Sequence, residues 1–145
     1  MHDPLSKRRL KAWVRLLEVT RRTESALREH LRLQHRTTLP RFDVMAALYR
    51  RQAGITMSEL SRMLLVSNGN ATTVVDRLEN DGLVRRTQSD ADRRTVFVAL
   101  TSAGLAQFET LATEHERELT RVFGNVSEAD LDTMTDILKR MGGAK

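Results

Sequence analysis

Polar side chains follow Ser67 at positions that alternate with a helical stripe of apolar residues. The stripe consists of Ala71, Val74, Val75 and Leu78. The positions left outside it are Asn68, Asn70, Thr72, Thr73 and Arg77. Asn can bond adenine and Arg can bond guanine through paired hydrogen bonds, while short hydroxyl side chains reach phosphates. Together with Ser67, this set suits contact with double-stranded DNA, and the alternative is an inert solvated helix face.

A second set of charged residues lies in the segment from Gln88 to Arg94. Arg93 and Arg94 are long cations that could enter a minor groove, and the neighbouring carboxylates of Asp90 and Asp92 could hold an arginine in position by a forked hydrogen bond. Arg86, just before this segment, is a further candidate DNA contact. The alternative interpretation is a solvated turn with internal ion pairs. Beside a DNA-reading helix, the same turn favours DNA contact.

The elements that must position these residues are predicted from capping and periodicity. Thr56 and Glu59 form a capping box that starts a short helix, and a turn near Ser67 separates it from a second helix ending at Asp81 and Gly82. After Gly82 the apolar period changes from 3.6 to 2, which predicts strands over 83–87 and 95–100. This order predicts a helix-turn-helix followed by a β-hairpin wing.

Four more helices are expected around this unit. A long amphipathic helix covers about 5–33, a second runs from Pro40 toward Gly54, a third starts at Thr101 and a fourth at Ser127. The predicted fold class is therefore mainly α with a small β-hairpin wing.

Composition excludes several classes of protein. The 145 residues include no cysteine, which removes disulfides, thiolate chemistry and thiolate metal sites. No phosphate-binding loop, nucleophile elbow or metal-binding pair of histidines is present, so we predict no enzyme, no catalytic residue, no cofactor and no metal site. His30, His35 and His115 can be considered as a zinc set, but neither a cysteine nor a His/Glu cluster at ligand spacing supports it, so these histidines are interpreted as structural or exposed. No apolar run is long enough for a membrane helix, and we expect a cytoplasmic protein with no membrane partner.

The positive charge is concentrated at the amino-terminal end. The net charge is +8 over residues 1–54, zero over 55–100 and −3 over 101–145. The segment with the predicted DNA contacts is thus electrically neutral. Specific side chains, rather than a general basic patch, would have to provide recognition there.

The predicted wing resembles that of the MarR family of bacterial regulators. The family signature of Asp-x-Arg, three residues, then Val-x-Leu-Thr matches residues 92–101, and Gly104 stands at the usual place in the next helix. Leu39-Pro40, Leu60, Ser67, the run 75–79 and residues 82–84 also look similar to the family pattern. The resemblance covers nearly the whole chain.

The resemblance implies a homodimer whose terminal helices intertwine. It implies a helical dimerisation region at 1–36 and 102–145 and a winged helix-turn-helix domain at 37–101. It further implies a near-palindromic operator, with Arg94 probing the minor groove and Asp92 orienting it, and a repressor released by a small ligand. Independently, the apolar stripes of the first and last helices are more than one chain of this length would cover, which favours dimerisation.

Family members commonly bind their effector between the dimerisation helices and the DNA-reading unit. Candidate ligand contacts are Trp13, Arg28, Phe42 and Met45, with plain core packing as the alternative for the apolar three. The arginines of the basic first helix are typical of a solvated face, but they would also suit phosphates or an anionic effector such as an aromatic acid or its coenzyme A thioester. Two other functions stay open: a helical protein-interaction module and a DNA-binding protein without an effector.

Overall fold

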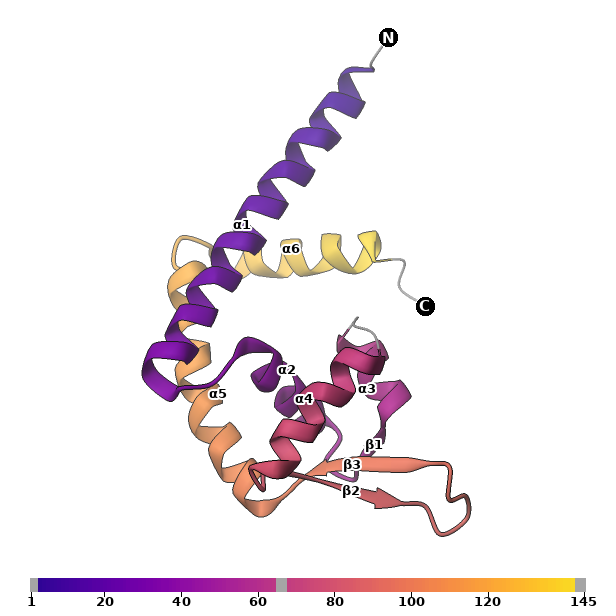
Figure 1. Ribbon diagram of the computed structural model, residues 1–145. Helices are drawn as coiled ribbons and strands as arrows, with labels where there is room; N and C mark the ends of the chain where they lie inside the picture. The colour runs from indigo at the N-terminus through magenta and orange to yellow at the C-terminus, as the bar shows by residue number, and fades with distance from the viewer. Residues whose placement is uncertain (1–2, 65–67, 143–145) are drawn as a thin grey trace.

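The computed structural model describes residues 3–64 and 68–142, which form six helices and three short strands (Figure 1). In chain order they are α1 (Pro4–His35), α2 (Leu39–Arg50), β1 (Ile55–Thr56), α3 (Met57–Leu64), α4 (Asn68–Asn80), β2 (Val84–Gln88), β3 (Val96–Leu100), α5 (Ser102–Val122) and α6 (Glu128–Met141). The predicted fold class, mainly α with a hairpin wing, is confirmed.

Side-chain caps begin the helices where the sequence predicts them. The Thr56 hydroxyl accepts a hydrogen bond from the Glu59 amide at 3.2 Å, and the Thr101 hydroxyl accepts one from the Gly104 amide at 3.0 Å. Ser127 caps α6 in the same way through the Asp130 amide at 3.1 Å. Each cap satisfies an amide that has no partner inside its helix.

The wing belongs to a three-stranded antiparallel sheet in the order β1-β3-β2. The predicted hairpin is confirmed, with Val84 opposite Leu100 and Gln88 opposite Val96. The sequence did not predict β1, in which Ile55 pairs with Val98. Two residues are too few to show a period of 2, so this strand has no local signal.

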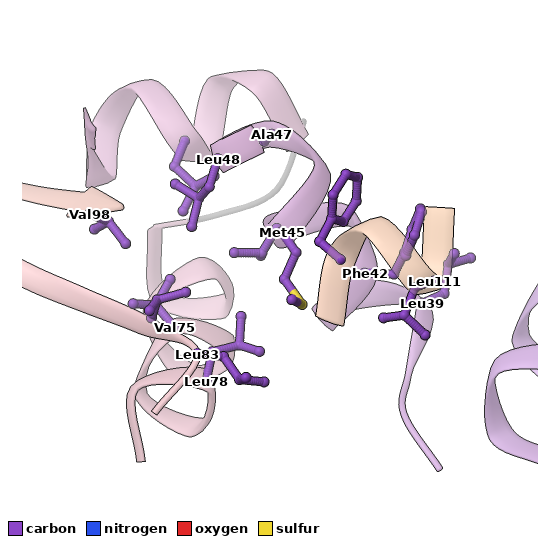
Figure 2. Close-up of a cluster of buried hydrophobic side chains, with 14 of the residues drawn as sticks. Leu39, Phe42, Met45, Ala47, Leu48, Val75, Leu78, Leu83, Val98 and Leu111 are labelled. Atoms are coloured by element: carbon purple, nitrogen blue, oxygen red, sulfur yellow. The ribbon is translucent and has the colours of Figure 1, made fainter. Parts of the chain in front are cut away.

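One apolar core joins the DNA-reading unit to the helices around it. Figure 2 shows Met45 and Leu48 of α2 near Val75 and Leu78 of α4, while Phe42 lies toward Leu111 of α5. The same cluster includes Leu27 and Leu31 of α1. The core therefore crosses both predicted domain boundaries, at residues 36 and 101.

Two helices leave much of their apolar surface without cover. The amino-terminal half of α1 extends away from the rest of the chain in Figure 1, and its Leu10 and Trp13 are 62% and 54% exposed. Helix α6 buries none of its residues, and Leu138 and Met141 are 43% and 66% exposed. No helix in the described ranges is both long and apolar enough to cross a membrane.

Candidate nucleic-acid interface

Helix α4 presents a polar face to solvent and an apolar face to the core. Ala71, Val75 and Leu78 are almost fully buried. The predicted contacts Asn70, Thr72, Thr73 and Arg77 are exposed on the same helix. Asn68 is the first residue of α4, and Ser67 lies outside the described residues. The division between faces therefore matches the one inferred from periodicity.

Two exposed residues of α4 differ in the hydrogen-bonding capacity that they retain. The Thr73 hydroxyl donates to the Gly69 carbonyl at 3.1 Å, so its proton is used within the helix. The Arg77 guanidinium has neither a hydrogen-bond partner nor an ion-pair partner in the part of the chain that the structure describes. Its guanidinium keeps all of its donors for an external acceptor.

Side chains hold the wing tip in a defined turn. The Ser89 hydroxyl accepts from the Ala91 and Asp92 amides at 3.2 and 3.4 Å. Asp92 then accepts from the Arg94 amide at 3.0 Å and from the Thr95 hydroxyl at 3.2 Å. Asp92 thus binds the backbone of Arg94, and the structure shows no forked bond from a carboxylate to either guanidinium of the tip among the described residues.

The two arginines of the tip are exposed. The backbone carbonyl of Arg93 accepts from the side-chain amide of Gln88 at 3.4 Å, and Arg93 and Arg94 are both exposed. Among residues 3–64 and 68–142, neither guanidinium has an ion-pair partner. Two unpaired cations at the end of a hairpin can bind phosphates or enter a narrow, electronegative groove.

Arg86 has a structural role that the sequence did not indicate. Its guanidinium donates to Glu79 at 2.8 Å and to Asp76 at 2.5 Å, both on α4, and its backbone amide donates to Glu79 at 3.0 Å. Partial burial is the largest single effect and lowers the pKa of Arg86, but the hydrogen bonds and charges of Asp76 and Glu79 together raise it above its ordinary value. The candidate DNA contact thus faces α4 and attaches the wing to that helix.

The start of α5 packs directly on the base of the wing. The Thr101 hydroxyl donates to the Gly82 carbonyl at 2.7 Å. A Cβ on Gly104 would lie 1.9 Å from the Leu83 carbonyl oxygen, so only glycine permits this approach. Gly82 itself has a φ of +76°, the left-handed region that glycine adopts without strain. Gly104, which matches the pattern noted in the sequence, therefore sets the distance between α5 and the wing.

The four candidate ligand contacts do not come together. Trp13 is exposed on the projecting part of α1, while Met45 is 1% exposed inside the core. Arg28 lines a cavity of about 500 Å³, whose other walls include Asp43 of α2 and Asn70 and Thr73 of α4. Phe42 lines a different cavity of about 710 Å³ together with Tyr49, Phe108 and His115.

A cluster that the sequence did not predict joins α1 to α5. His35 Nε2 forms a hydrogen bond with Glu114 Oε2, and His30 Nε2 lies 3.5 Å from the same oxygen. The hydrogen bond from His35 is the main cause that lowers the pKa of Glu114. His115 does not belong to this cluster: its ring stacks on Phe42 with ring centroids 4.1 Å apart, and partial burial followed by the charge of His30 lowers the pKa of His115. Since His35 and Glu114 are 79 residues apart, local spacing carries no sign of their contact.

A short capped helix, a second helix with an exposed polar face and a hairpin with two unpaired arginines define a winged helix-turn-helix protein. Comparison with known proteins specifies the family. The MarR family model matches residues 37–96. The HTH-type transcriptional regulator MhqR of Bacillus subtilis is 26% identical over 138 residues, which cover 95% of this chain and 94% of that protein.

Solved structures extend the similarity over the whole fold. AbsC, a MarR family transcriptional regulator from Streptomyces coelicolor, matches with a TM-score of 0.85 and 26% identity over 99% of this chain and 95% of that chain. A mutant of E. coli MarR complexed with operator DNA matches with a TM-score of 0.79 and 26% identity, over 97% and 99% of the two chains. The chain belongs to the MarR family and is a DNA-binding transcriptional regulator.

Proposed function

We propose that this regulator acts as a homodimer on a near-palindromic operator, and that it is a repressor released by a small ligand. In this proposal the amino-terminal half of α4 enters the major groove, where Asn70, Thr72 and Thr73 face outward. Arg77 binds a base edge or a phosphate, and Arg94 reaches the minor groove. The similarity to a MarR protein complexed with operator DNA supports this docking mode.

The uncovered helices support the homodimer. Exposed Leu10, Trp13 and Val14 on α1, together with Ile137 and Leu138 on α6, form more apolar surface than a stable monomer usually leaves in water. A second copy of the chain can cover these faces by two-fold symmetry. We therefore propose that residues 1–36 and 102–145 form the dimerisation region around a DNA-binding domain at 37–101.

The main support for control by a ligand is the cavity beside Arg28. Its walls include Glu24 and Arg28 of α1 and Asn70, Thr73 and Val74 of α4. A molecule bound there would contact a proposed dimerisation helix and the proposed DNA-reading helix at once. Any ligand that fits only one relative position of these helices shifts the population of DNA-binding conformations.

The charges around this cavity specify the effector more closely. Arg28 is its one arginine among the described residues, and it lies 3.5 Å from Glu24 across a helical turn. Asp43 adds a second carboxylate, and partial burial followed by the charge of Glu24 raises the pKa of Asp43. We propose an aromatic acid whose carboxylate binds Arg28 and whose hydroxyl or amine donors bind Asp43 or Glu24. The other arginines of α1 do not line this cavity, which favours the free acid over a coenzyme A thioester.

The experiment is a thermal-shift screen of aromatic acids and their coenzyme A thioesters, followed by gel-shift titration of operator DNA with each hit. We expect a hit to raise the melting temperature and to release DNA, and Arg28→Ala to lose both effects. Arg32→Ala is the matched control, because Arg32 pairs with Glu29 on the exposed side of the same helix. Full DNA binding in the presence of every stabilising ligand would contradict ligand control.

Dimerisation and repression need separate measurements. We expect sedimentation equilibrium to give twice the chain mass, and Leu10→Glu with Leu138→Glu to lower the mass toward that of one chain. In vitro transcription from an operator-bearing promoter should fall when the protein is added. A monomeric wild type, or increased transcription, would contradict these two parts of the proposal independently of DNA binding.

A further inference from the structure

Two histidines of α1 and one glutamate of α5 place three metal-ligating atoms close together. One ligand atom from each of His30, His35 and Glu114 lies within 4.8 Å of the other two. Both histidine side chains are 16% exposed, so neither imidazole is a freely moving surface group. The rings meet edge to face, with centroids 5.6 Å apart. This packing holds both rings beside the same carboxylate.

One of the three separations, between His30 and Glu114, is close to that of a first coordination shell, whereas His35 and Glu114 are in direct hydrogen-bond contact and would have to move apart to admit an ion. Two ligands at roughly 2.1 Å from Zn²⁺ in a tetrahedral site lie roughly 3.4 Å from each other. His30 Nε2 and Glu114 Oε2 are 3.5 Å apart. That separation is wide for a hydrogen bond, and the buried His30 Nε2 has no hydrogen-bond partner. An ion beside Glu114 Oε2 would give His30 Nε2 the partner that it lacks.

A second carboxylate lies on the opposite side of the His30 ring. His30 Nδ1 is 3.6 Å from Glu118 Oε1, one helical turn beyond Glu114 on α5. A carboxylate beside one imidazole nitrogen favours the tautomer with the proton on that nitrogen, which leaves the other nitrogen free to bind a metal. Glu118 therefore lies where a positioning residue for a His30 ligand belongs.

We propose that His30, His35 and Glu114 bind a Zn²⁺ ion, with Glu118 orienting His30. Two imidazoles and one carboxylate are a ligand set that Zn²⁺ accepts, with a fourth position left for water. A neighbouring cavity of about 330 Å³, lined by His30, Glu114 and Glu118, provides room for that water and a route for the ion. Binding replaces the hydrogen bond between His35 and Glu114 with two metal bonds.

The surrounding charges fit a site of limited affinity. Arg117 and Arg121 line the same cavity, and Arg121 donates to Glu118 at 3.0 Å. The charges of Arg117 and Arg121 repel a metal cation, whereas the carboxylates of Glu114 and Glu118 attract it. The ion would join the carboxy-terminal end of α1 to α5 and so restrain the segment that leads into α2.

The test uses the full chain after removal of metals with a chelator. Zn²⁺ is titrated in competition with a chromophoric chelator, and Co²⁺ is then added to reveal ligand-field bands in the visible spectrum. We expect one Zn²⁺ per chain, a higher melting temperature with the ion, and a Co²⁺ spectrum of low coordination number. His30→Gln, His35→Gln and Glu114→Gln should each abolish the Co²⁺ bands. Glu118→Gln should lower the affinity by about 10- to 100-fold.

Two control variants separate this site from general binding to histidines and carboxylates. His115→Gln removes a nearby histidine that stacks on Phe42 outside the cluster, and Glu109→Gln removes an exposed carboxylate of α5. Both should retain wild-type stoichiometry and affinity. Circular dichroism and the melting temperature without metal identify any variant that fails to fold. The proposal is overturned if the wild type binds no Zn²⁺, or if the folded cluster variants bind it like the controls.

Discussion

Arg86 of β2 binds Glu79 of α4 through both its side chain and its backbone. The guanidinium donates at 2.8 Å to one carboxylate oxygen and the backbone amide donates at 3.0 Å to the other. Asp76, one helical turn earlier, accepts a further bond at 2.5 Å. The orientation of the wing relative to α4 therefore depends on this contact, and the two parts that are proposed to touch DNA are joined by it.

Replacing Arg86 with Ala should weaken the fold and reduce DNA affinity indirectly. We expect the free energy of unfolding to fall by about 1–2 kcal/mol in urea titrations, because charge-assisted hydrogen bonds are lost at a partly exposed site. The salt dependence of DNA binding should not change. Arg85→Ala is the control for stability, since Arg85 is exposed on the same strand. A salt slope reduced by about one, with unchanged stability, would instead make Arg86 a phosphate contact.

Arg94→Ala should weaken DNA binding directly, without the loss of stability that we expect for Arg86→Ala. The side chain is exposed at the wing tip, so its removal should leave the free energy of unfolding within about 0.5 kcal/mol of the wild type. Gel-shift titration should show weaker operator binding, because a cation that reaches the minor groove is lost. Unchanged operator affinity would disprove the proposed role of the wing.

Asp92→Asn tests the tip geometry separately from its charge. Asp92 accepts bonds from the Arg94 amide and the Thr95 hydroxyl, and an amide can accept through only one of its two terminal atoms. We expect a loosened turn and lower operator affinity although the net positive charge increases. Asp90→Asn makes the same charge change at an exposed tip residue and should bind at least as well as the wild type. If Asp92→Asn and Asp90→Asn bind the operator equally well, the hydrogen bonds that Asp92 makes in the turn do not contribute to DNA binding and only its charge does.

Arg77→Ala should reveal which part of the DNA this residue binds. If Arg77 contacts a guanine edge, affinity for the cognate operator falls by about 1–3 kcal/mol and the preference at one base pair is relaxed. Binding measured across a set of single-substituted operators gives this preference. Thr135→Ala, on the exposed part of α6, is a control far along the chain from α4. A uniform loss across all sequences would indicate a phosphate contact.

Gly104→Ala should destabilise the junction between α5 and the wing. The added Cβ would lie 1.9 Å from the Leu83 carbonyl oxygen, and backbone atoms must move to admit it. We expect a loss of about 1–3 kcal/mol in the free energy of unfolding, measured by urea titration. Gly69→Ala in α4 is the matched control, because no atom lies within 4 Å of its added Cβ. That variant should be more stable by up to about 1 kcal/mol; equal effects would contradict the packing argument.

Asp43→Asn should raise stability near neutral pH and lose the advantage in acid. Burial raises the pKa of Asp43 above its ordinary value of 3.8, with Glu24 adding to this effect and Arg28 and Arg50 opposing it. The folded state therefore favours the protonated carboxyl, and stability falls as pH rises through the raised pKa. Melting temperatures of the ligand-free proteins should differ at pH 7 and converge below pH 3.8. Asp90→Asn is the control, and a less stable Asp43→Asn at pH 7 would contradict the sign.

Local sequence predicted the helices, the two strands of the hairpin and the polar face of α4, but not β1. Caps at Thr56, Thr101 and Ser127 and a change of period after Gly82 are properties of neighbouring residues, so they can be read without a fold. The same periodicity separated the buried Val75 and Leu78 from the exposed Arg77. The wing motif at 92–101 added the resemblance to the family that the comparisons show.

The tertiary structure decided what each exposed or polar group faces. Sequence placed Arg86 among the DNA contacts, but the packing of β2 against α4 directs it to Asp76 and Glu79. The tertiary structure also keeps Trp13 away from Phe42, and it brings His30 and His35 to Glu114. Periodicity tells which side of an element is apolar, because burial acts on each residue locally. Which charged groups meet depends on how distant elements pack, and no spacing along the chain records that.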